Sequence, residues 1–211
     1  MSIVDKAIAA ITPPESEESR MKAREKARAC AESGDWLSMI LDHHLQIEDA
    51  FAAVKAAAEP EQRMRAQKRL AVILTGHAQA EEAAVYPILA QCGEKGHAGM
   101  GYTEQAAVKM QMAELENIDP MSQAYLDKLG HIEGAVKHHV FEEEGTWYPH
   151  LQENADQATR MKLTEKYSEE VGRYLGQDAD MDGAPGASTM AEPRSFATDL
   201  GSAGDQTRPT V

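Results

Sequence analysis

Two stretches of this chain share one pattern, GHAQAEEAAVYP at 76–87 and HHVFEEEGTWYP at 138–149. In each, a glutamate follows a histidine by four residues, and a Tyr-Pro pair follows with its proline six residues after the glutamate. The histidine–glutamate pairs are His77/Glu81 and His139/Glu143. One such match arises easily by chance, but two with the same trailing Tyr-Pro indicate a duplicated helical hairpin.

The histidines of this pattern continue apolar stripes that have helical spacing. Steps of three and four run straight through His77 and His139, and a third stripe does the same through His44. The stripes are Leu70, Ile73, His77, Ala84 and Ile88; Leu129, Ile132, Val136, His139 and Trp147; and Leu37, Ile40, His44, Ile47, Phe51 and Val54. Each histidine is therefore predicted to point into the core, with Glu81 and Glu143 one turn later on the same face.

Three imidazoles and two carboxylates in one small core need an explanation, because an unpaired buried ion is strongly destabilising. A lone buried histidine is usually a hydrogen-bonded core residue, and a single His-x-x-x-Glu is usually an exposed helix pair. Neither interpretation accounts for all five groups on the inward faces of different helices. Imidazole and carboxylate at this spacing suit iron, manganese or zinc, and helical bundles hold such sites in their cores. The sequence predicts a buried metal site.

The composition favours helices and argues against several classes of partner. The chain has 211 residues, and 21 Lys+Arg against 35 Asp+Glu give a formal net charge of −14. Nucleic acid and anionic membranes need a basic surface, and no apolar run approaches the ~20 residues that span a bilayer. Aromatic residues make up only 5%, which favours helix over strand. The two cysteines, Cys30 and Cys92, make no disulfide framework, so we expect a cytoplasmic protein.

Capping residues divide the chain into segments. Asp35 and Pro60 open two predicted helices, Asp119-Pro120 opens another, and Thr12-Pro13-Pro14-Glu15 predicts an earlier helix start. The main helices are expected at 35–58, 60–93, 103–117, 119–145 and 156–175. The residues after them are rich in Gly, Ala, Ser, Asp and Pro, and cannot bury enough surface to offset the entropy of ordering. The predicted organisation is an N-terminal helical extension at 1–34, a helical bundle at 35–175 and a disordered tail at 176–211.

With Leu41-Asp42-His43-His44 as a first element, these motifs resemble the hemerythrin family in its HHE cation-binding branch. That family has a histidine on helix one, His-x-x-x-Glu on helix two, a histidine on helix three and His-x-x-x-Glu on helix four. The resemblance covers about 35–151. It implies an up-down four-helix bundle around a non-haem di-iron centre, with two irons per chain, although zinc and manganese suit the same ligands. It also implies oxygen binding, oxygen or redox sensing, or peroxide chemistry.

Helix three departs from the family pattern, which would place a histidine where this chain has Glu104-Gln105. Gln105 occupies the inward position, because Val108 and Met112 follow it at core spacing. Several substitutes for the missing histidine remain open. Gln105 binds weakly or through water, Glu48 supplies a third carboxylate one turn after His44, or a side chain before helix three reaches in. The last group comprises His97 and Tyr102. We favour an open position on the metal, with Glu48 assisting or forming an ordinary salt bridge at the rim.

The remaining candidates are expected to be peripheral. His44 takes the ligand role on helix one, whereas His43 points about 100° away and is expected to be exposed or to support a ligand. Glu142 and Glu144 are expected on a solvated face beside Glu143. Four glycines are expected to make a flexible loop before helix three. These glycines are Gly93, Gly96, Gly99 and Gly101.

The predicted metal ligands are His44, His77, Glu81, His139, Glu143, Gln105 and Glu48. Three functions remain open at this point. The first is a di-iron protein that binds or reacts with O2, NO or peroxide, with enzymatic turnover undecided. The second is an iron-handling or signalling module in which metal occupancy controls the bundle. The third is a metal-free interaction protein, in which replacing the core histidines by leucine would stabilise the fold. A protein partner of the tail cannot be named.

Overall fold

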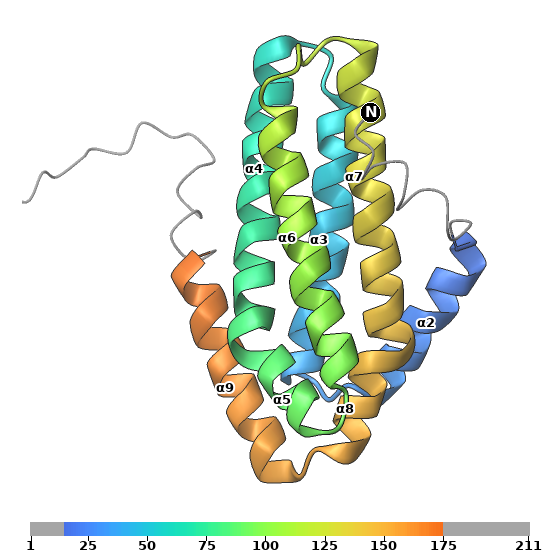
Figure 1. Ribbon diagram of the computed structural model, residues 1–211, viewed down its shortest axis with the longest axis vertical. Coiled ribbons are helices and arrows are strands. Elements are labelled where there is room, and N and C mark those ends of the chain that lie inside the picture. Colours follow the sequence, from blue (N-terminus) through green and yellow to red (C-terminus); the bar gives the residue numbers. More distant parts are fainter. Residues whose placement is uncertain (1–14, 175–211) are drawn as a thin grey trace, which may run out of the picture. The chain divides into compact units, whose positions relative to one another are not determined.

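The computed structural model describes residues 15–174, and every regular element within them is helical. Four long helices run side by side with alternating direction (Figure 1). They are α3 (Trp36–Ala56), α4 (Pro60–Ala80), α6 (Lys95–Leu115) and α7 (Gln123–Glu142). The predicted all-α, up-down four-helix bundle is confirmed. The predicted disordered tail at 176–211 and most of the Thr12–Glu15 helix start lie outside the described residues.

Helices α4 and α7 both widen at the glutamate of the repeated motif. Each continues into a π-helical turn, η1 (Glu81–Val85) after α4 and η2 (Glu143–Trp147) after α7, before the short α5 (Tyr86–Gln91) and α8 (Tyr148–Asn154). The prolines explain these turns. A proline inside an α-helix has no N–H to donate and clashes with the carbonyl four residues earlier. A π turn before Pro87 and Pro149 relieves that conflict.

Two further helices pack on the outside of the bundle. Helix α2 (Glu17–Cys30) lies against η2, α8 and α3, and helix α9 (Gln157–Tyr174) lies against α4, η1 and α3 (Figure 1). Ser16 caps α2, its hydroxyl accepting from the backbone N–H of Ser19 at 3.1 Å. The two outer helices therefore approach the π turns from different sides.

The observed helix starts agree with some predicted caps and correct others. Asp35 caps α3 as predicted, since its Oδ1 accepts from the backbone N–H of Ser38 at 2.7 Å. Helix α7 begins later than predicted, with Ser122 as its cap. Asp119 instead accepts from the backbone N–H of Met121 at 3.0 Å and shapes the preceding turn. An Asx turn and a helix cap use the same side-chain chemistry, so the sequence alone did not separate them.

Helix α6 begins at Lys95, well before the predicted start at residue 103. The predicted flexible loop is therefore wrong for Gly96, Gly99 and Gly101, which are helical, although Gly93 does lie in the connection with φ 101°. Packing explains why residue 101 is a glycine, because a Cβ there would lie 2.6 Å from Cζ of Tyr86. Contact with the Tyr86 ring overrides the weak helix propensity of glycine at this position.

The core has two apolar clusters, one near the π turns and one toward the opposite end of the bundle. The first includes Trp36, Leu41 and Trp147, and the second includes Ile47, Phe51 and Leu129. On α3 these two clusters are separated by His44, which is 1% exposed. The same change from one cluster to the other occurs on α4 around His77. The buried histidines thus form a polar layer between two dry regions.

Candidate metal centre

Four predicted ligands meet in this polar layer. His44 comes from α3, His77 from the last turn of α4, Glu81 from η1 and Glu143 from η2. One ligand atom from each lies within 4.8 Å of the other three, and all four side chains are buried. The spacing of four residues places each glutamate beside its own histidine, while α4 and α7 run in the same direction and bring both π turns to the same end of the bundle (Figure 1).

The donor atoms of this cluster fit a cation. Nε2 of His44, Nε2 of His77 and Oε2 of Glu143 are buried and have no hydrogen-bond partner. Each of the two nitrogens lies near a carboxylate oxygen without forming a hydrogen bond to it. The distances are 3.4 Å from His44 Nε2 to Glu143 Oε2 and 3.2 Å from His77 Nε2 to Glu81 Oε2. Buried polar atoms normally find partners, so convergent unpartnered atoms call for another group. Nitrogen and carboxylate donors suit iron, manganese or zinc.

A chain of buried contacts holds the outer nitrogen of His44. Its Nδ1 lies 2.9 Å from Oε1 of Glu144, and Nε of Arg24 on α2 donates to the same carboxylate at 3.0 and 3.2 Å. Glu144 is only 1% exposed, so its predicted place on a solvated face is wrong. A carboxylate on Nδ1 fixes the tautomer of the imidazole and leaves Nε2 free to accept a metal.

The outer nitrogen of His77 faces helix α9. The hydroxyl of Tyr167 lies 3.4 Å from Nδ1 of His77 and 2.8 Å from Nδ1 of His43. His43 is buried against Tyr167 and supports a ligand through it, so the alternative that it is exposed is wrong. If His77 donates to the Tyr167 oxygen and that hydroxyl donates to His43, Nε2 of His77 stays free.

Two buried tyrosines hold the carboxylates. The Tyr148 hydroxyl makes very short contacts with both Glu81 and Glu143, donating its one proton to one of them and accepting from protonated Glu81 when it donates to Glu143, and Tyr86 donates to Oε1 of Glu143 at 3.0 Å. Each tyrosine follows its glutamate by five residues, and the π turn brings positions so spaced onto the same side of the helix. The sequence contained this signal, since the Tyr-Pro pair was recognised as part of the repeat, but it was assigned no role at the site.

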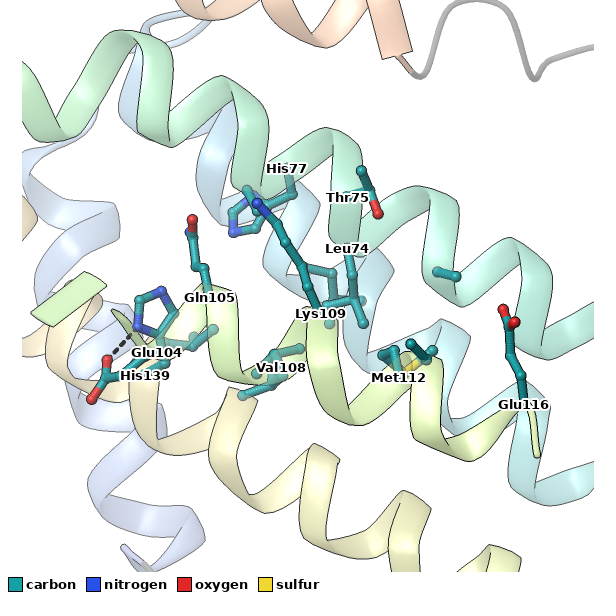
Figure 2. A pocket seen from close by; sticks show the side chains of 16 residues that line it. Leu74, Thr75, His77, Glu104, Gln105, Val108, Lys109, Met112, Glu116 and His139 are labelled. Atoms are coloured by element: carbon teal, nitrogen blue, oxygen red, sulfur yellow. Dashed lines mark hydrogen bonds and ion pairs between the residues drawn. The ribbon is translucent and has the colours of Figure 1, made fainter. Parts of the chain in front are cut away.

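His139 lies beside the four-residue cluster rather than within it. Its Nε2 is 3.2 Å from Oε1 of Glu143 and 3.2 Å from the Tyr86 hydroxyl. Its Nδ1 lies 2.7 Å from Oε2 of Glu104 on α6, the ion pair drawn in Figure 2. The side chain is buried, as the apolar stripe predicted.

Gln105 occupies the predicted inward position on α6 and is 5% exposed. Its amide nitrogen donates to Oε2 of Glu81 at 2.6 Å and to the Tyr86 hydroxyl at 2.7 Å. Its amide oxygen is buried and has no partner. Gln105 therefore acts on the cluster as a donor that holds a carboxylate, and it keeps one free acceptor.

The other candidates for the missing histidine lie away from the cluster. Glu48 is paired with Arg24 at 2.8 Å and is partly exposed. His97 stacks on Trp147, with ring centroids 5.3 Å apart, and its Nδ1 lies 2.8 Å from Glu94. Tyr102 donates to the backbone carbonyl of Glu82 at 2.9 Å. The structure brings none of these three side chains among the four converging ligand atoms.

The electrostatics of the metal-free cluster are uneven. Burial and the nearby charge of Glu143 raise the pKa of Glu81 to about 8. Burial alone would raise the pKa of Glu143 too, but His139 and His44 outweigh burial and hold it well below its ordinary value. Burial alone would lower the pKa of His44, but the adjacent carboxylates of Glu143 and Glu144 raise it to about 9. Without a metal the cluster therefore holds protons that a cation would displace.

Fold and cluster together define a helical-bundle protein with a buried histidine–carboxylate cluster that could hold a metal ion. The Hemerythrin HHE cation binding domain matches residues 22–151, so the chain belongs to the hemerythrin family. The match begins in α2, within the stretch that was predicted as an extension. The part of the chain that the structure describes contains no helix long and apolar enough to cross a membrane.

One curated relative adds little to this assignment. A protein named DNA nickase, from Nostoc sp. (strain PCC 7120 / SAG 25.82 / UTEX 2576), is 25% identical over 114 residues. The aligned part is 54% of this chain and 32% of that protein, so this chain spans about a third of its length. No solved structure gives a significant match.

Proposed function

We propose that this chain is a non-haem di-iron protein of the hemerythrin type, whose buried centre binds or reacts with O2, NO or peroxide. The observation that carries the proposal is the convergence of unpartnered His44 and His77 nitrogens on the carboxylates of Glu81 and Glu143. Iron would supply reversible redox change and a position for a small ligand. The net charge of −14 supports a small-molecule partner over nucleic acid.

The ligands fall into two groups around the carboxylates. His44 and His77 would hold one ion, and His139 would hold the second, because its Nε2 lies on the Oε1 side of Glu143. Gln105 stands where the family has a histidine, but its nitrogen is turned to Glu81. This second ion would therefore lack one imidazole and keep an open position. We leave Glu48 outside the ligand set because Arg24 holds its carboxylate.

The chain's own residues favour a reaction that needs hydrogen-bond donors at the centre over simple carriage of oxygen. Tyr86 and Tyr148 keep their hydroxyl protons against the two carboxylates, because burial and those carboxylates raise the pKa of both phenols well above the ordinary value. A dry site without donors would favour reversible oxygen binding. Two phenols at the centre favour peroxide turnover.

The first experiment measures iron per chain together with the visible spectrum before and after adding azide. We expect about two irons per chain and a near-ultraviolet band that shifts with azide, since bundle sites of this ligand type are dinuclear and one position is open. Gln105→His should slow azide entry and peroxide consumption while retaining both irons. One ion or none after iron-replete expression, with a featureless spectrum, would contradict the proposal.

A second function has its own supporting observation. Helices α2 and α9 reach the outer nitrogens of His44 and His77 through Arg24, Glu144 and Tyr167. Metal occupancy would thus be coupled to the docking of both outer helices, as in an iron-handling or signalling module. This alternative predicts that a chelator makes α2 sensitive to protease while peroxide consumption is absent with the metal bound. Peroxide consumption with α2 equally protected in both states would favour the first function.

A further inference from the structure

A cavity of about 190 Å³ opens beside the metal centre, along the seam between α4 and α6. Figure 2 shows its two ends, with His77, Gln105 and His139 at one and Met112 and Glu116 at the other. Small side chains leave this space, since Ala71 and Ala78 face it from α4. The seam reaches the surface at Thr75 and Glu116, both exposed.

The wall of the cavity is mainly apolar. Its apolar lining residues include Leu74, Val108, Met112, Ile47, Val136 and Val140. Engineered apolar cavities of about 150 Å³ stay dry and bind benzene. Apolar clefts with a few placed polar groups are the usual form of small-molecule sites. The size and lining therefore suit a compact apolar molecule about as large as a single aromatic ring.

Of the lysine and glutamate side chains that line the cavity, Lys109 and Glu104 are paired, and Glu116 is exposed where the seam reaches the surface. Lys109 binds Glu82 at 2.8 Å, and Glu104 lies 2.7 Å from Nδ1 of His139. An anionic ligand would have to break the Lys109–Glu82 pair, and a cation would have to break the His139–Glu104 contact. These pairings favour a neutral ligand.

Gln105 gives the cavity one specific polar feature. Its amide nitrogen is committed to Glu81 and Tyr86, which fixes the orientation of the amide. Its oxygen is buried without a partner on the same side chain that lines the cavity. A buried acceptor in this state gains a hydrogen bond from a ligand that brings a donor and gains nothing from one that lacks it.

We propose that this cavity binds a small neutral organic molecule with an apolar body and one hydroxyl or amino donor, phenol being the simplest member. The apolar body packs against Val108 and Met112, and the donor reaches Oε1 of Gln105. The ligand then lies beside His77 and His139, next to the proposed centre. Binding itself requires no metal, so this inference stands apart from the proposed function.

The test uses 4-fluorophenol and fluorobenzene as probes, followed by fluorine NMR on the full-length chain in its iron-loaded and chelated forms. We expect one saturable site for 4-fluorophenol in both forms, with contacts to the methyl groups of Val108 and Met112. Fluorobenzene should bind at least about fivefold more weakly, which is the value of one hydrogen bond. Absence of saturable 4-fluorophenol binding in both forms would overturn the inference, whatever the iron content.

Variants locate the site. Val108→Phe and Ala78→Leu fill the cavity from opposite helices and should abolish binding, while Met110→Phe, on the exposed side of α6, should leave it unchanged. Gln105→Leu should remove the preference for 4-fluorophenol and keep fluorobenzene binding. Binding that survives both filling substitutions, or a preference that survives in a folded Gln105→Leu protein, would contradict the assignment. The methyl contacts in the unsubstituted chain decide the matter if these variants do not fold.

Discussion

The two halves of the repeat have the same local structure and different surroundings. In each, an α-helix carries the histidine, a π turn begins at the glutamate, and a tyrosine five residues on turns back to the carboxylates. His77 belongs to the converging cluster, however, and His139 lies beside it with Glu104 on its other nitrogen. Identical spacing in the sequence therefore gave identical backbones and unequal sites.

The carboxylates show the same inequality. The pKa of Glu81 is raised to about 8 by burial and by Glu143, while that of Glu143 is held well below its ordinary value because His139 and His44 outweigh burial. The outer supports differ as well. The first half depends on Tyr167 of α9, and the second half supplies Glu144, which Arg24 of α2 holds. Neighbours from other helices decide what each half does.

The largest expected effect comes from neutralising the two glutamates one at a time. In the metal-free chain Glu143→Gln should cost about 1.5–3 kcal/mol of unfolding free energy, because it removes the carboxylate that protonated His44 and His139 share and leaves each with one charged partner, Glu144 or Glu104. Glu81→Gln should cost less than about 1.5 kcal/mol, since an amide resembles the protonated acid that Glu81 is at neutral pH. Urea unfolding at neutral pH measures both. Equal losses would refute the inequality of the two halves.

The outer supports should affect metal affinity next most strongly. Arg24→Met and Glu144→Gln should each lower it by about 10–100-fold, because the carboxylate on Nδ1 orients His44. Tyr167→Phe should lower it less, since its contact with His77 is long at 3.4 Å. A competition titration against a coloured chelator reports the affinities.

Arg28→Met is the matched control for this series, because Arg28 lies on the same helix and pairs with Asp42 at 3.0 Å away from the site. Its metal affinity should equal that of the unsubstituted chain. A loss as large as that of Arg24→Met would mean that docking of α2 as a whole, rather than the contact with Glu144, supports the metal.

A third feature of the first half of the repeat is that its tyrosine, Tyr86, packs closely against Gly101 of α6. Gly101→Ala should lower the unfolding free energy by about 1–3 kcal/mol, because the new Cβ would lie 2.6 Å from Cζ of Tyr86. Gly130→Ala on α7 has open space around it and should stabilise the protein by up to about 1 kcal/mol. Thermal unfolding of the two variants distinguishes them, and a neutral Gly101→Ala would show that the ring moves without cost.

The last expected effect is that of pH on metal binding. The pKa of His44 is raised to about 9 in the metal-free fold, against an ordinary value of 6.5. Between these values the folded chain holds a proton that the unfolded chain has released, so stability without metal falls as pH rises. A metal must displace this proton and, below about pH 8, the proton of Glu81 as well, so its affinity should rise by at least about tenfold per pH unit.

The difference in melting temperature between zinc-loaded and chelated protein should therefore grow from about pH 6.5 to 9. Replacing Glu144 by Gln removes one of the bonds that raise the pKa of His44, and should flatten this dependence. A metal-induced shift that is constant over the whole range would contradict the protonated state of His44.

Much of this architecture could be predicted from local patterns. The stripes through His44, His77 and His139 predicted their burial, and the structure confirms it. The predicted start of α6 was too late, because a glycine-rich sequence usually indicates a loop. Gly101 lies within the helix because the ring of Tyr86 packs against it and leaves no room for a Cβ. Glu144 was misassigned because Arg24, which makes its burial possible, lies 120 residues away in the sequence.

The sequence by itself determined the helices, the inward faces of the histidines and glutamates, and the family of the protein, because spacing along one helix fixes which side chains share a face. Only the tertiary structure decided which four side chains converge, that Gln105 points its nitrogen at Glu81, and that a cavity remains between α4 and α6. The physical reason is that distances between helices depend on how their surfaces pack, and no local pattern contains that information.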